Sequence, residues 1–334
     1  MPLPFIAIFR GGYTGESVIS LKSAGTILDA LDKKRFDAAY ITVERSGWTC
    51  TRADGTSLPF DRADFTADRG QGPERFTAAF IVIHGTPGED GKLQGYLEML
   101  GVPYQTGGVL NMALTMSKFS TTGLLRQMGF PVSPSIIVHR DDPESADRVL
   151  RKVGVPCFVK PDNSGSSLGI SKVKTEEELR PALEIAFAED HTVMCEAYIK
   201  GRELTCGVIN YQNKIQALPV CEIRTTREFF DFEAKYNALD TEEIVPAPIP
   251  DAIAAIVQQR SEAIYRALNC NGMVRIDHFW LEGQGDGQQV LTIEVNTVPG
   301  FTPVSIFPKM LAAAGILIGD LVNGMVERMV QPSR

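Results

Sequence analysis

The sequence has few cysteines and no long apolar run. Its six cysteines form no C-x-x-C pair and no regular spacing, which argues against a disulfide scaffold or a zinc site. No segment approaches the roughly 18 apolar residues that a membrane span requires, and the apolar run at residues 5–9 is shorter than the core of a signal peptide. We therefore expect reduced thiols, a cytoplasmic location and no membrane partner.

Positive charge is also scarce. The 33 lysines and arginines are outnumbered by 41 acidic residues, which gives a net charge of −8. Because the basic residues form no block along the chain, nucleic acid and anionic membranes are not expected as partners. Basic residues that matter for function must therefore act locally. The content of 44% hydrophobic and 22% charged residues is that of an ordinary folded protein.

The length of 334 residues suggests two or three domains, because a domain usually spans roughly 100–200 residues. The N-terminal third is predicted to be α/β, with a strand at 5–9, a glycine-containing turn and a helix at 18–31. Two further strands, at 38–43 and 79–84, flank a polar segment of loops and a hairpin. Glycines and a proline at 101–108 break the pattern and mark a first boundary.

The rest of the chain alternates between helical and strand-like patterns, with an irregular segment at 225–250. Helices are predicted at 111–128, 143–153, 175–189, 251–268 and, as an amphipathic tail that packs on the core, 308–329. Strands are predicted at 135–138, 157–160, 170–173, 193–196, 204–210, 214–220, 272–277 and 293–296.

The most informative residues lie on the last two of these strands. Arg275 and Asp277 alternate with apolar residues, as do Glu294 and Asn296, so each pair shares one face of its strand. Buried carboxylates need a partner, and acidic oxygens on two strands suit Mg²⁺, which prefers oxygen ligands. A metal nucleotide is the natural ligand. The alternative is a structural cluster in which Arg275 pairs with Asp277 and Glu294.

A loop rich in glycine and serine follows the strand that ends near Lys160. The loop G-S-S-L-G spans 165–169 and leads into another strand. Its backbone N–H groups, the hydroxyls of Ser166 and Ser167 and the Lys160 ammonium are suited to phosphate oxygens. It is not a Walker A loop, which requires G-x-x-x-x-G-K-[ST] before a helix. A plain hairpin with a flexible turn is the alternative.

A third candidate is the segment where the strand at 193–196 ends and the chain turns. Glu196 and the backbone around Tyr198 and Ile199 are candidates to receive the edge of an adenine, and Glu203 is a candidate to accept from ribose hydroxyls. The alternative is an edge strand with solvated charges.

Two strand ends of the N-terminal region carry further candidates. His84 ends a predicted parallel strand, the position at which open α/β sheets bind ligands, although a histidine there can also be purely structural. The turn G-G-Y-T-G-E at 11–16 lacks the spacing of a dinucleotide-binding loop. Its last residue, Glu16, is a candidate for holding an ammonium group.

Taken together, and in this order, these motifs resemble the ATP-grasp superfamily and, within it, the D-alanine–D-alanine ligases. The resemblance covers nearly the whole chain. The nucleotide half is common to many ATP-grasp enzymes, whereas the His84 segment and the motif E-A-K-Y at 233–236 are more specific to the ligases. The resemblance implies three domains: an N-terminal Rossmann-like parallel-sheet domain at 1–105, a central lobe at 106–199 and a C-terminal lobe at 200–334 that carries the metal and substrate site.

The resemblance also implies a two-step reaction for peptidoglycan precursor synthesis. One D-alanine carboxylate takes the γ-phosphate of ATP, and the amino group of a second D-alanine attacks the resulting acyl phosphate. The family's ATP-binding positions fall on Lys118, Lys160, Ser166, Ser167, Glu196, Tyr198, Ile199, Glu203 and Lys235. Those that hold two Mg²⁺ or Mn²⁺ ions fall on Asp277, Glu294 and Asn296.

Substrate positions follow in the same way. Glu16 is implied to orient the ammonium of the first D-alanine and Arg275 to stabilise the tetrahedral intermediate, while His84, Gly300 and Ser305 are implied substrate contacts. These three join Glu16 and Arg275 as the substrate-binding set.

A lid at 229–240 is implied to close over this site and to exclude water. Tyr236 would reach toward Ser166 and Glu16, and these residues with Arg275 form the implied catalytic set. A tyrosine at 236, where depsipeptide-forming relatives have histidine, favours an amine as the second nucleophile. A homodimer is expected from the family.

The chain departs from the family pattern at four positions. Asn111 replaces a serine, Ser117 replaces an aspartate before the nucleotide-binding lysine, and Ser164 replaces a glutamate before the glycine–serine loop; His278 is unusual after the metal-binding aspartate. None of these changes removes a residue assigned to chemistry. Two rival functions remain: a ligase for another amino-acid pair, and a nucleotide-binding module without turnover.

Overall fold

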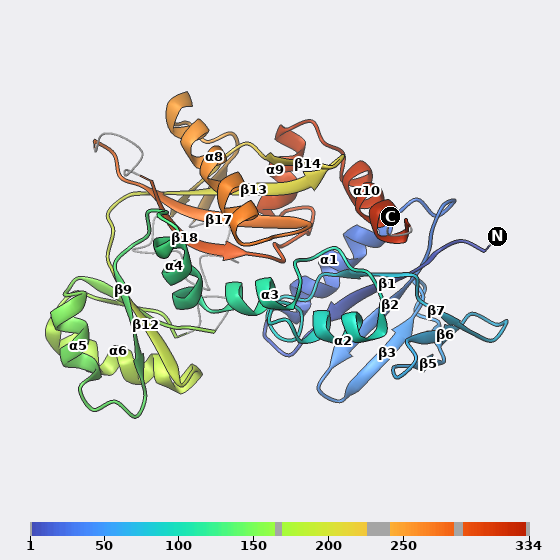
Figure 1. Ribbon diagram of the computed structural model, residues 1–334, viewed down its shortest axis with the longest axis horizontal. Coiled ribbons are helices and arrows are strands. Elements are labelled where there is room, and N and C mark those ends of the chain that lie inside the picture. Colours follow the sequence, from blue (N-terminus) through green and yellow to red (C-terminus); the bar gives the residue numbers. More distant parts are fainter. Residues whose placement is uncertain (1, 164–168, 226–240, 284–289, 332–334) are drawn as a thin grey trace.

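The computed structural model describes residues 2–163, 169–225, 241–283 and 290–331. Figure 1 shows three sheet-containing parts: the N-terminal sheet at one end of the molecule, a small lobe with α5 and α6 at the other, and a larger sheet covered by α8. Each of the three large sheets draws its strands from one of the three predicted ranges. The boundaries themselves, at 105/106 and 199/200, stay predictions.

The N-terminal sheet is built on a fully apolar strand. β1 (Phe5–Gly11) pairs in parallel with β2 (Asp37–Glu44) and β8 (Ala78–Ile81), and α1 (Ser17–Ala30) makes the crossover from β1 to β2. The parallel α/β prediction is thereby confirmed. Gly11 has φ +92, and a Cβ there would lie 2.6 Å from the Val43 carbonyl oxygen, so the turn toward α1 requires glycine.

The polar segment between β2 and β8 forms short antiparallel strands. β3 (Gly47–Thr51) and β4 (Ser57–Leu58) extend the main sheet, giving the order β4-β3-β2-β1-β8. The other three strands form a small separate sheet: β5 (Phe60–Asp61), β6 (Thr66–Asp68) and β7 (Pro73–Arg75).

The predicted helix at 111–128 is in fact two helices, so that prediction was wrong in one respect. After α2 (Lys92–Leu100), α3 (Val109–Met116) ends at Ser117, whose backbone is extended, and α4 (Lys118–Gln127) begins at the next residue. The Ser117 hydroxyl accepts a hydrogen bond from Ser120 N, which is the N-cap interaction that starts a new helix. The break makes Lys118 the first residue of α4.

The small lobe is an antiparallel sheet covered by two helices on one side. Its order is β11-β10-β12-β9, and its core lies between the sheet and the helices. The strands are β9 (Ser135–His139), β10 (Cys157–Pro161), β11 (Ser171–Val173) and β12 (Thr192–Ala197). The helices are α5 (Ser145–Lys152) and α6 (Glu176–Glu189).

The largest sheet holds the two strands that the sequence singled out. Its order is β16-β15-β13-β17-β18, with β14 paired to β13, and α8 (Asp251–Ala267) packs on it. Its strands are β13 (Arg202–Tyr211), β14 (Lys214–Ala217), β15 (Cys221–Thr225), β16 (Thr241–Ile244), β17 (Met273–Trp280) and β18 (Val290–Asn296).

The C-terminal tail is two helices and not the single one predicted. α9 (Ile306–Ala313) and α10 (Ile318–Val330) are separated at Gly315, which has φ +70, a conformation that ends helices. No single helix of the described chain is long and apolar enough to span a membrane; α9 and α10 meet that criterion only as a pair bent by 101°.

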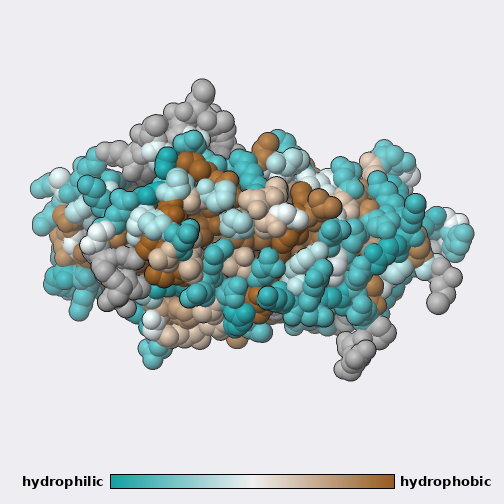
Figure 2. Space-filling view, turned by 90° about the horizontal axis from the view of Figure 1, so that it is seen from above, coloured by the Kyte–Doolittle hydropathy of each residue, from teal (hydrophilic) through white to brown (hydrophobic). Residues whose placement is uncertain are grey.

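The tail joins the two ends of the chain into one core. A single buried cluster contains Ile8 of β1 and Phe80 of β8 together with Phe307 of α9 and Leu321 of α10. The N-terminal sheet and the C-terminal lobe therefore share apolar packing. In the view of Figure 2, hydrophobic side chains gather along the middle of the molecule, and its ends are mostly hydrophilic.

Gly88 provides a test of the turn that follows β8. A Cβ at Gly88 would lie 2.2 Å from the Ile83 carbonyl oxygen, whereas one at Gly123, inside α4, would meet nothing within 4 Å. We expect Gly88→Ala to lower the free energy of unfolding by about 1–3 kcal/mol, as overpacking does. Gly123→Ala is the matched control and should raise it by up to about 1 kcal/mol. Equal stabilities of the two variants in urea unfolding would contradict this packing.

Candidate active site

A cavity of about 410 Å³ opens where the three parts of the molecule meet. It brings together most of the predicted site residues that the structure describes, from seven separate segments of the chain. These are Glu16, His84, Lys118, Lys160, Glu196, Glu203, Arg275, Asp277, Glu294, Asn296, Gly300 and Ser305.

Paired strands form the floor of this cavity. β17 and β18 are antiparallel, with Arg275 opposite Asn296 and Asp277 opposite Glu294. Directly opposite residues of paired strands have neighbouring side chains on one face, so the predicted shared face is confirmed. A register irregularity between Asp277 and His278 marks the point where the two strands change their pairing.

Asp277 is the centre of a hydrogen-bond network on this floor. It accepts from Arg275 Nε at 3.0 Å and Nη2 at 2.9 Å, from Asn296 Nδ2 at 2.9 Å and from Thr205 Oγ1 at 2.5 Å. The Arg275–Asp277 ion pair, expected if these residues form a purely structural cluster, is therefore present. It leaves Glu294 for another partner, because the Glu294 carboxylate lies 3.7 Å from Lys118 Nζ.

The electrostatics of the floor favour a charged arginine. Burial alone would lower the pKa of the Arg275 guanidinium, but Asp277, with Glu294 and Glu203 further away, outweighs burial and raises this pKa above its ordinary value. Arg275 therefore stays cationic at every physiological pH, within a cavity that holds several carboxylates.

The donor set of Asp277, Glu294 and Asn296 fits a hard divalent cation. Two carboxylates and an amide lie on adjacent strands, and their oxygens are ligands that Mg²⁺ and Mn²⁺ accept. Within the described residues, no group of three His, Cys, Asp or Glu side chains is arranged to hold a metal. The predicted site thus depends on the amide of Asn296 and on oxygens that a ligand brings.

The side of the cavity nearest the small lobe carries a buried ion pair with one carboxylate oxygen that has no hydrogen bond. Lys160 Nζ donates to Glu196 Oε2 at 2.7 Å, and both side chains are less than 10% exposed. Burial would lower the pKa of Lys160, but Glu196 outweighs it and raises this pKa. Glu196 Oε1 is buried and has no hydrogen-bond partner among the described residues. An unpaired buried acceptor indicates a donor from a ligand, such as the amino group of an adenine.

The substitution of Ser117 is explained by a nearby aspartate. Asp162 is buried, and it accepts from the Ser117 hydroxyl at 2.6 Å and from Phe119 N at 2.8 Å. A carboxylate is thus present at the start of α4 although position 117 is a serine. It fixes the helix start that places Lys118 in the cavity.

The substitution of Asn111 is explained by packing. Asn111 Nδ2 donates to the Leu268 carbonyl at 2.8 Å, which ties α3 to the end of α8. A Cβ on Gly107 would lie 1.9 Å from Asn111 Oδ1. The larger side chain therefore fits because residue 107 is glycine.

His84 is held by the segment that follows β18. Its Nδ1 donates to the Val298 carbonyl at 2.8 Å, while its Nε2 is buried without a partner among the described residues. Burial lowers the pKa of His84, although Glu16 and the Val298 carbonyl oppose this. A neutral ring that donates from Nδ1 keeps a lone pair on Nε2, which is free to accept from an ammonium group.

Glu89 is a cavity residue that the sequence reasoning did not select. Its carboxylate accepts from Gly85 N at 2.6 Å and from Val298 N at 3.2 Å. His84 thus binds the carbonyl of Val298 and Glu89 binds its N–H group. These hydrogen bonds link the N-terminal region to the C-terminal lobe. The signal was available in the G-E-D-G run that follows His84.

Another part of the cavity wall is formed by the start of α9. Ser305 precedes the first residue of α9, and its hydroxyl accepts from Thr302 N at 3.1 Å. Gly300 lies against it, since a Cβ there would be 3.2 Å from Ser305 Oγ. The N-terminus of a helix favours a carboxylate.

His278 lies on the opposite face of β17, away from the cavity. It is fully buried, with Nε2 2.9 Å from Ser261 Oγ and Nδ1 3.3 Å from Thr292 Oγ1. Burial lowers its pKa to about 3. His278 is therefore a neutral core residue with both nitrogens hydrogen-bonded.

Six predicted residues are not placed in the cavity. Tyr198 and Ile199 do not line it, and the Tyr198 N–H is already bonded to the Pro156 carbonyl. The Tyr198 ring instead packs on Phe158. The other predicted residues, and one departure, lie outside the described part of the chain: Ser164, Ser166, Ser167, Lys235 and Tyr236.

Two antiparallel lobes meet at a cavity that holds Lys118 and Lys160 beside a floor of carboxylates, which is the architecture of an ATP-grasp enzyme. Family models for the N-terminus and C-terminus of D-Ala–D-Ala ligase match residues 5–107 and 124–327. The chain therefore belongs to the D-alanine–D-alanine ligase family, whose members are ATP-dependent ligases of small-molecule substrates.

Individual relatives agree with this assignment. The D-alanine–D-alanine ligase of Phocaeicola vulgatus is 40% identical over 96% of this chain and 98% of its own length, and that of Porphyromonas gingivalis is 42% identical over 95% and 94%. Among solved structures, D-alanyl-alanine synthetase A of Vibrio cholerae has a TM-score of 0.87 at 28% identity, covering 99% of both chains. The VanG D-Ala:D-Ser ligase of Enterococcus faecalis has a TM-score of 0.86 at 29% identity, covering 98% of this chain and 100% of its own.

The raised pKa of Glu89 gives a prediction for stability. Burial raises this pKa from 4.5 to about 7, so the folded state holds a proton that the unfolded state has lost in this range. The stabilisation is present at low pH and is lost as pH rises from about 4.5 to about 7. Glu89→Gln should remove that pH dependence from urea unfolding curves.

Glu184→Gln, at an exposed position of α6, is the matched control and should follow the wild type. Parallel pH profiles for the wild type and Glu89→Gln would show that the Glu89 carboxylate does not titrate in this range.

Proposed function

We propose that this chain joins two D-alanines into D-alanyl-D-alanine, with conversion of ATP to ADP and phosphate, for peptidoglycan precursors in the cytoplasm. The observation that carries the proposal is the geometry of one cavity: Arg275, Asp277 and Glu294 on its floor share it with His84 and Glu16 from the N-terminal region. Anion-binding and ammonium-binding groups are thus combined in one site.

ATP would lie between the two antiparallel lobes. Lys160 and Lys118 would contact phosphates, and the free Oε1 of Glu196 would accept from the adenine, with Glu203 near the ribose. Ser166, Ser167, Lys235 and the backbone at 198–199 belong to the same proposal by family resemblance. Two Mg²⁺ or Mn²⁺ ions held by Asp277, Glu294 and Asn296 would neutralise charge on the phosphates.

The first D-alanine would be oriented by its ammonium group. Glu16 supplies a carboxylate, and the Nε2 lone pair of His84 supplies a second acceptor. One oxygen of the substrate carboxylate attacks the γ-phosphorus, the bond from that phosphorus to the β–γ bridging oxygen breaks, and ADP leaves.

The second D-alanine would bind by its carboxylate at Ser305 and Gly300, at the start of α9. Its neutral amino group attacks the acyl carbon, an N–H proton is lost, and phosphate leaves as the amide bond forms. Arg275 would stabilise the oxyanion of the tetrahedral intermediate. Tyr236 with Ser166 and Glu16 would close the site against water, which would otherwise hydrolyse the acyl phosphate.

D-serine is the rival second substrate, since one similar structure is a D-Ala:D-Ser ligase. The purified protein should be incubated with ATP, Mg²⁺ and D-alanine, and in parallel with D-alanine plus D-serine, L-alanine or D-lactate. D-alanyl-D-alanine at one phosphate per peptide bond supports the proposal. A mixed dipeptide in preference to D-alanyl-D-alanine would change the second substrate, and no turnover would support a binding module. The proposed homodimer is tested by light scattering on the same sample.

Arg275→Ala should abolish dipeptide formation and leave ATP binding measurable. The substitution removes the group that stabilises the oxyanion. In other enzymes, loss of one such hydrogen-bond donor raises the activation free energy by about 2.7–4 kcal/mol. Dipeptide formation is followed by mass spectrometry and ATP binding by calorimetry. Arg140→Ala, at an exposed site on the small lobe, is the matched control and should keep full activity. Full activity of Arg275→Ala would remove the role proposed for this residue.

A further inference from the structure

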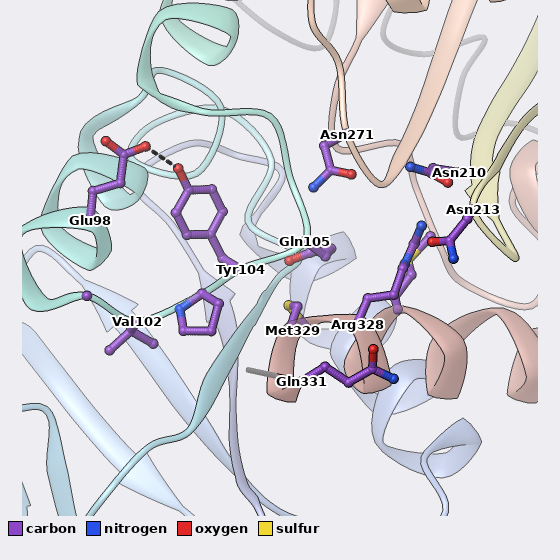
Figure 3. A pocket seen from close by; sticks show the side chains of 13 residues that line it. Glu98, Val102, Tyr104, Gln105, Asn210, Asn213, Asn271, Arg328, Met329 and Gln331 are labelled. Carbon is purple, nitrogen blue, oxygen red and sulfur yellow. Dashed lines mark hydrogen bonds between the residues drawn. The ribbon is translucent and has the colours of Figure 1, made fainter. Parts of the chain in front are cut away.

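A second cavity of about 630 Å³ lies at the seam between the N-terminal region and the C-terminal lobe, within the roughly 300–1,000 Å³ typical of ligand sites. Its walls come from the segment after α2, the β13–β14 turn, the loop before β17 and the last turns of α10 (Figure 3). Among the described residues it shares no lining residue with the candidate active site.

Arg328 is the cation of this seam cavity. It lies in the last turn of α10, is partly buried, and has no hydrogen bond or ion pair with the described residues. Burial lowers the pKa of the Arg328 guanidinium, and the opposing electrostatic effect of Tyr265 is smaller. Desolvation of a guanidinium is normally offset by an anionic acceptor. The described residues provide none, and because the guanidinium lines the cavity, an anion bound there would satisfy it.

Asparagines stand on the same side of the cavity as Arg328 (Figure 3). Asn210 is near the end of β13, Asn213 has φ +61 in the following turn, and Asn271 precedes β17. Asn210 Oδ1 is buried and has no hydrogen-bond partner among the described residues. It therefore offers an acceptor to a ligand N–H or O–H group.

The opposite side of the cavity carries negative charge. Figure 3 shows Glu98 and Tyr104 across the cavity from Arg328. The Tyr104 hydroxyl donates to Glu98 Oε1 at 2.5 Å, and Glu98 Oε2 has no hydrogen bond with the described residues. A cation and a carboxylate thus face the same space from opposite walls.

Part of the wall is held in place by backbone contacts across the seam. The Gln105 side-chain amide makes two hydrogen bonds with the backbone of Ile81. Its Oε1 accepts from Ile81 N at 2.9 Å, and its Nε2 donates to the Ile81 carbonyl at 2.6 Å. A Cβ on Gly272 would lie 2.3 Å from the Gln105 carbonyl oxygen, so the two sides of the seam are in direct contact. A wall held in this way reduces the ordering that binding requires.

We propose that the seam cavity binds a small zwitterion of the amino-acid or short-peptide class. Its carboxylate pairs with Arg328, its ammonium group with Glu98, and an amide N–H is donated to Asn210. A simple anion such as phosphate is a poorer match, because it would use Arg328 alone and would be repelled by Glu98. Val102, Met325 and Met329 leave apolar surface for small side chains.

The test is calorimetric titration of the full chain with glycylglycine, which bears both charges and one amide. We expect saturable binding that weakens at least tenfold, equivalent to about 1.4 kcal/mol, in Arg328→Gln and in Glu98→Gln. Arg328→Lys should retain part of the affinity. Arg140→Gln, on the exposed surface of the small lobe, is the matched control and should bind like the wild type.

Two further probes separate the charges. N-acetylglycylglycine, which lacks the ammonium group, should bind more weakly and be insensitive to Glu98→Gln. Phosphate should show no Arg328-dependent binding. Arg328-dependent phosphate binding without glycylglycine binding would overturn the proposal in favour of a simple anion site.

Glycylglycine binding that neither Arg328→Gln nor Glu98→Gln changes would place the ligand elsewhere and also overturn the proposal. No saturable binding at millimolar glycylglycine, with the variants folded by circular dichroism, would do the same. None of these readouts requires turnover, so the outcome is independent of the proposed ligase reaction.

Discussion

The pairing of β17 with β18 is the constraint on which the site depends. Their register sets Arg275 opposite Asn296 and Asp277 opposite Glu294. A shift by one residue would turn every one of these side chains to the other face, where Ile276 and Val295 now belong to the core. Packing of the apolar face in the core therefore fixes the strand register. The same register places the charged side chains on the face that lines the cavity.

The charges on this floor are held by one another. Asp277 bonds Arg275, Asn296 and Thr205, so that no single group is buried without a partner. A buried pair of this kind adds little net stability, but it orients the guanidinium and leaves Glu294 directed at Lys118. The structural and the functional interpretations of these residues are thus compatible, since the same contacts that satisfy the buried charges also aim them at the cavity.

The sequence predicted those parts that local pattern determines. The apolar run of β1 and the alternation around Arg275 lead directly to buried strands, and most candidate residues meet in one cavity. Helix interruptions were missed, because the breaks at Ser117 and Gly315 occur inside continuous apolar periodicity and depend on single backbone conformations. Glu89 was missed for another reason: the G-E-D-G run marks the segment, but the partner that gives Glu89 its role, Val298, lies 209 residues away.

Departures from the family pattern are easier to understand as pairs than as single changes. Asn111 requires the missing Cβ of Gly107, and Ser117 requires Asp162 to supply the carboxylate at the start of α4. In both cases a partner residue completes the structure: Asn111 makes a hydrogen bond to the end of α8, and Asp162 binds the start of the helix that presents Lys118. Because a partner residue completes each substituted position, the changes at 111 and 117 leave the lysines and carboxylates of the cavity in place.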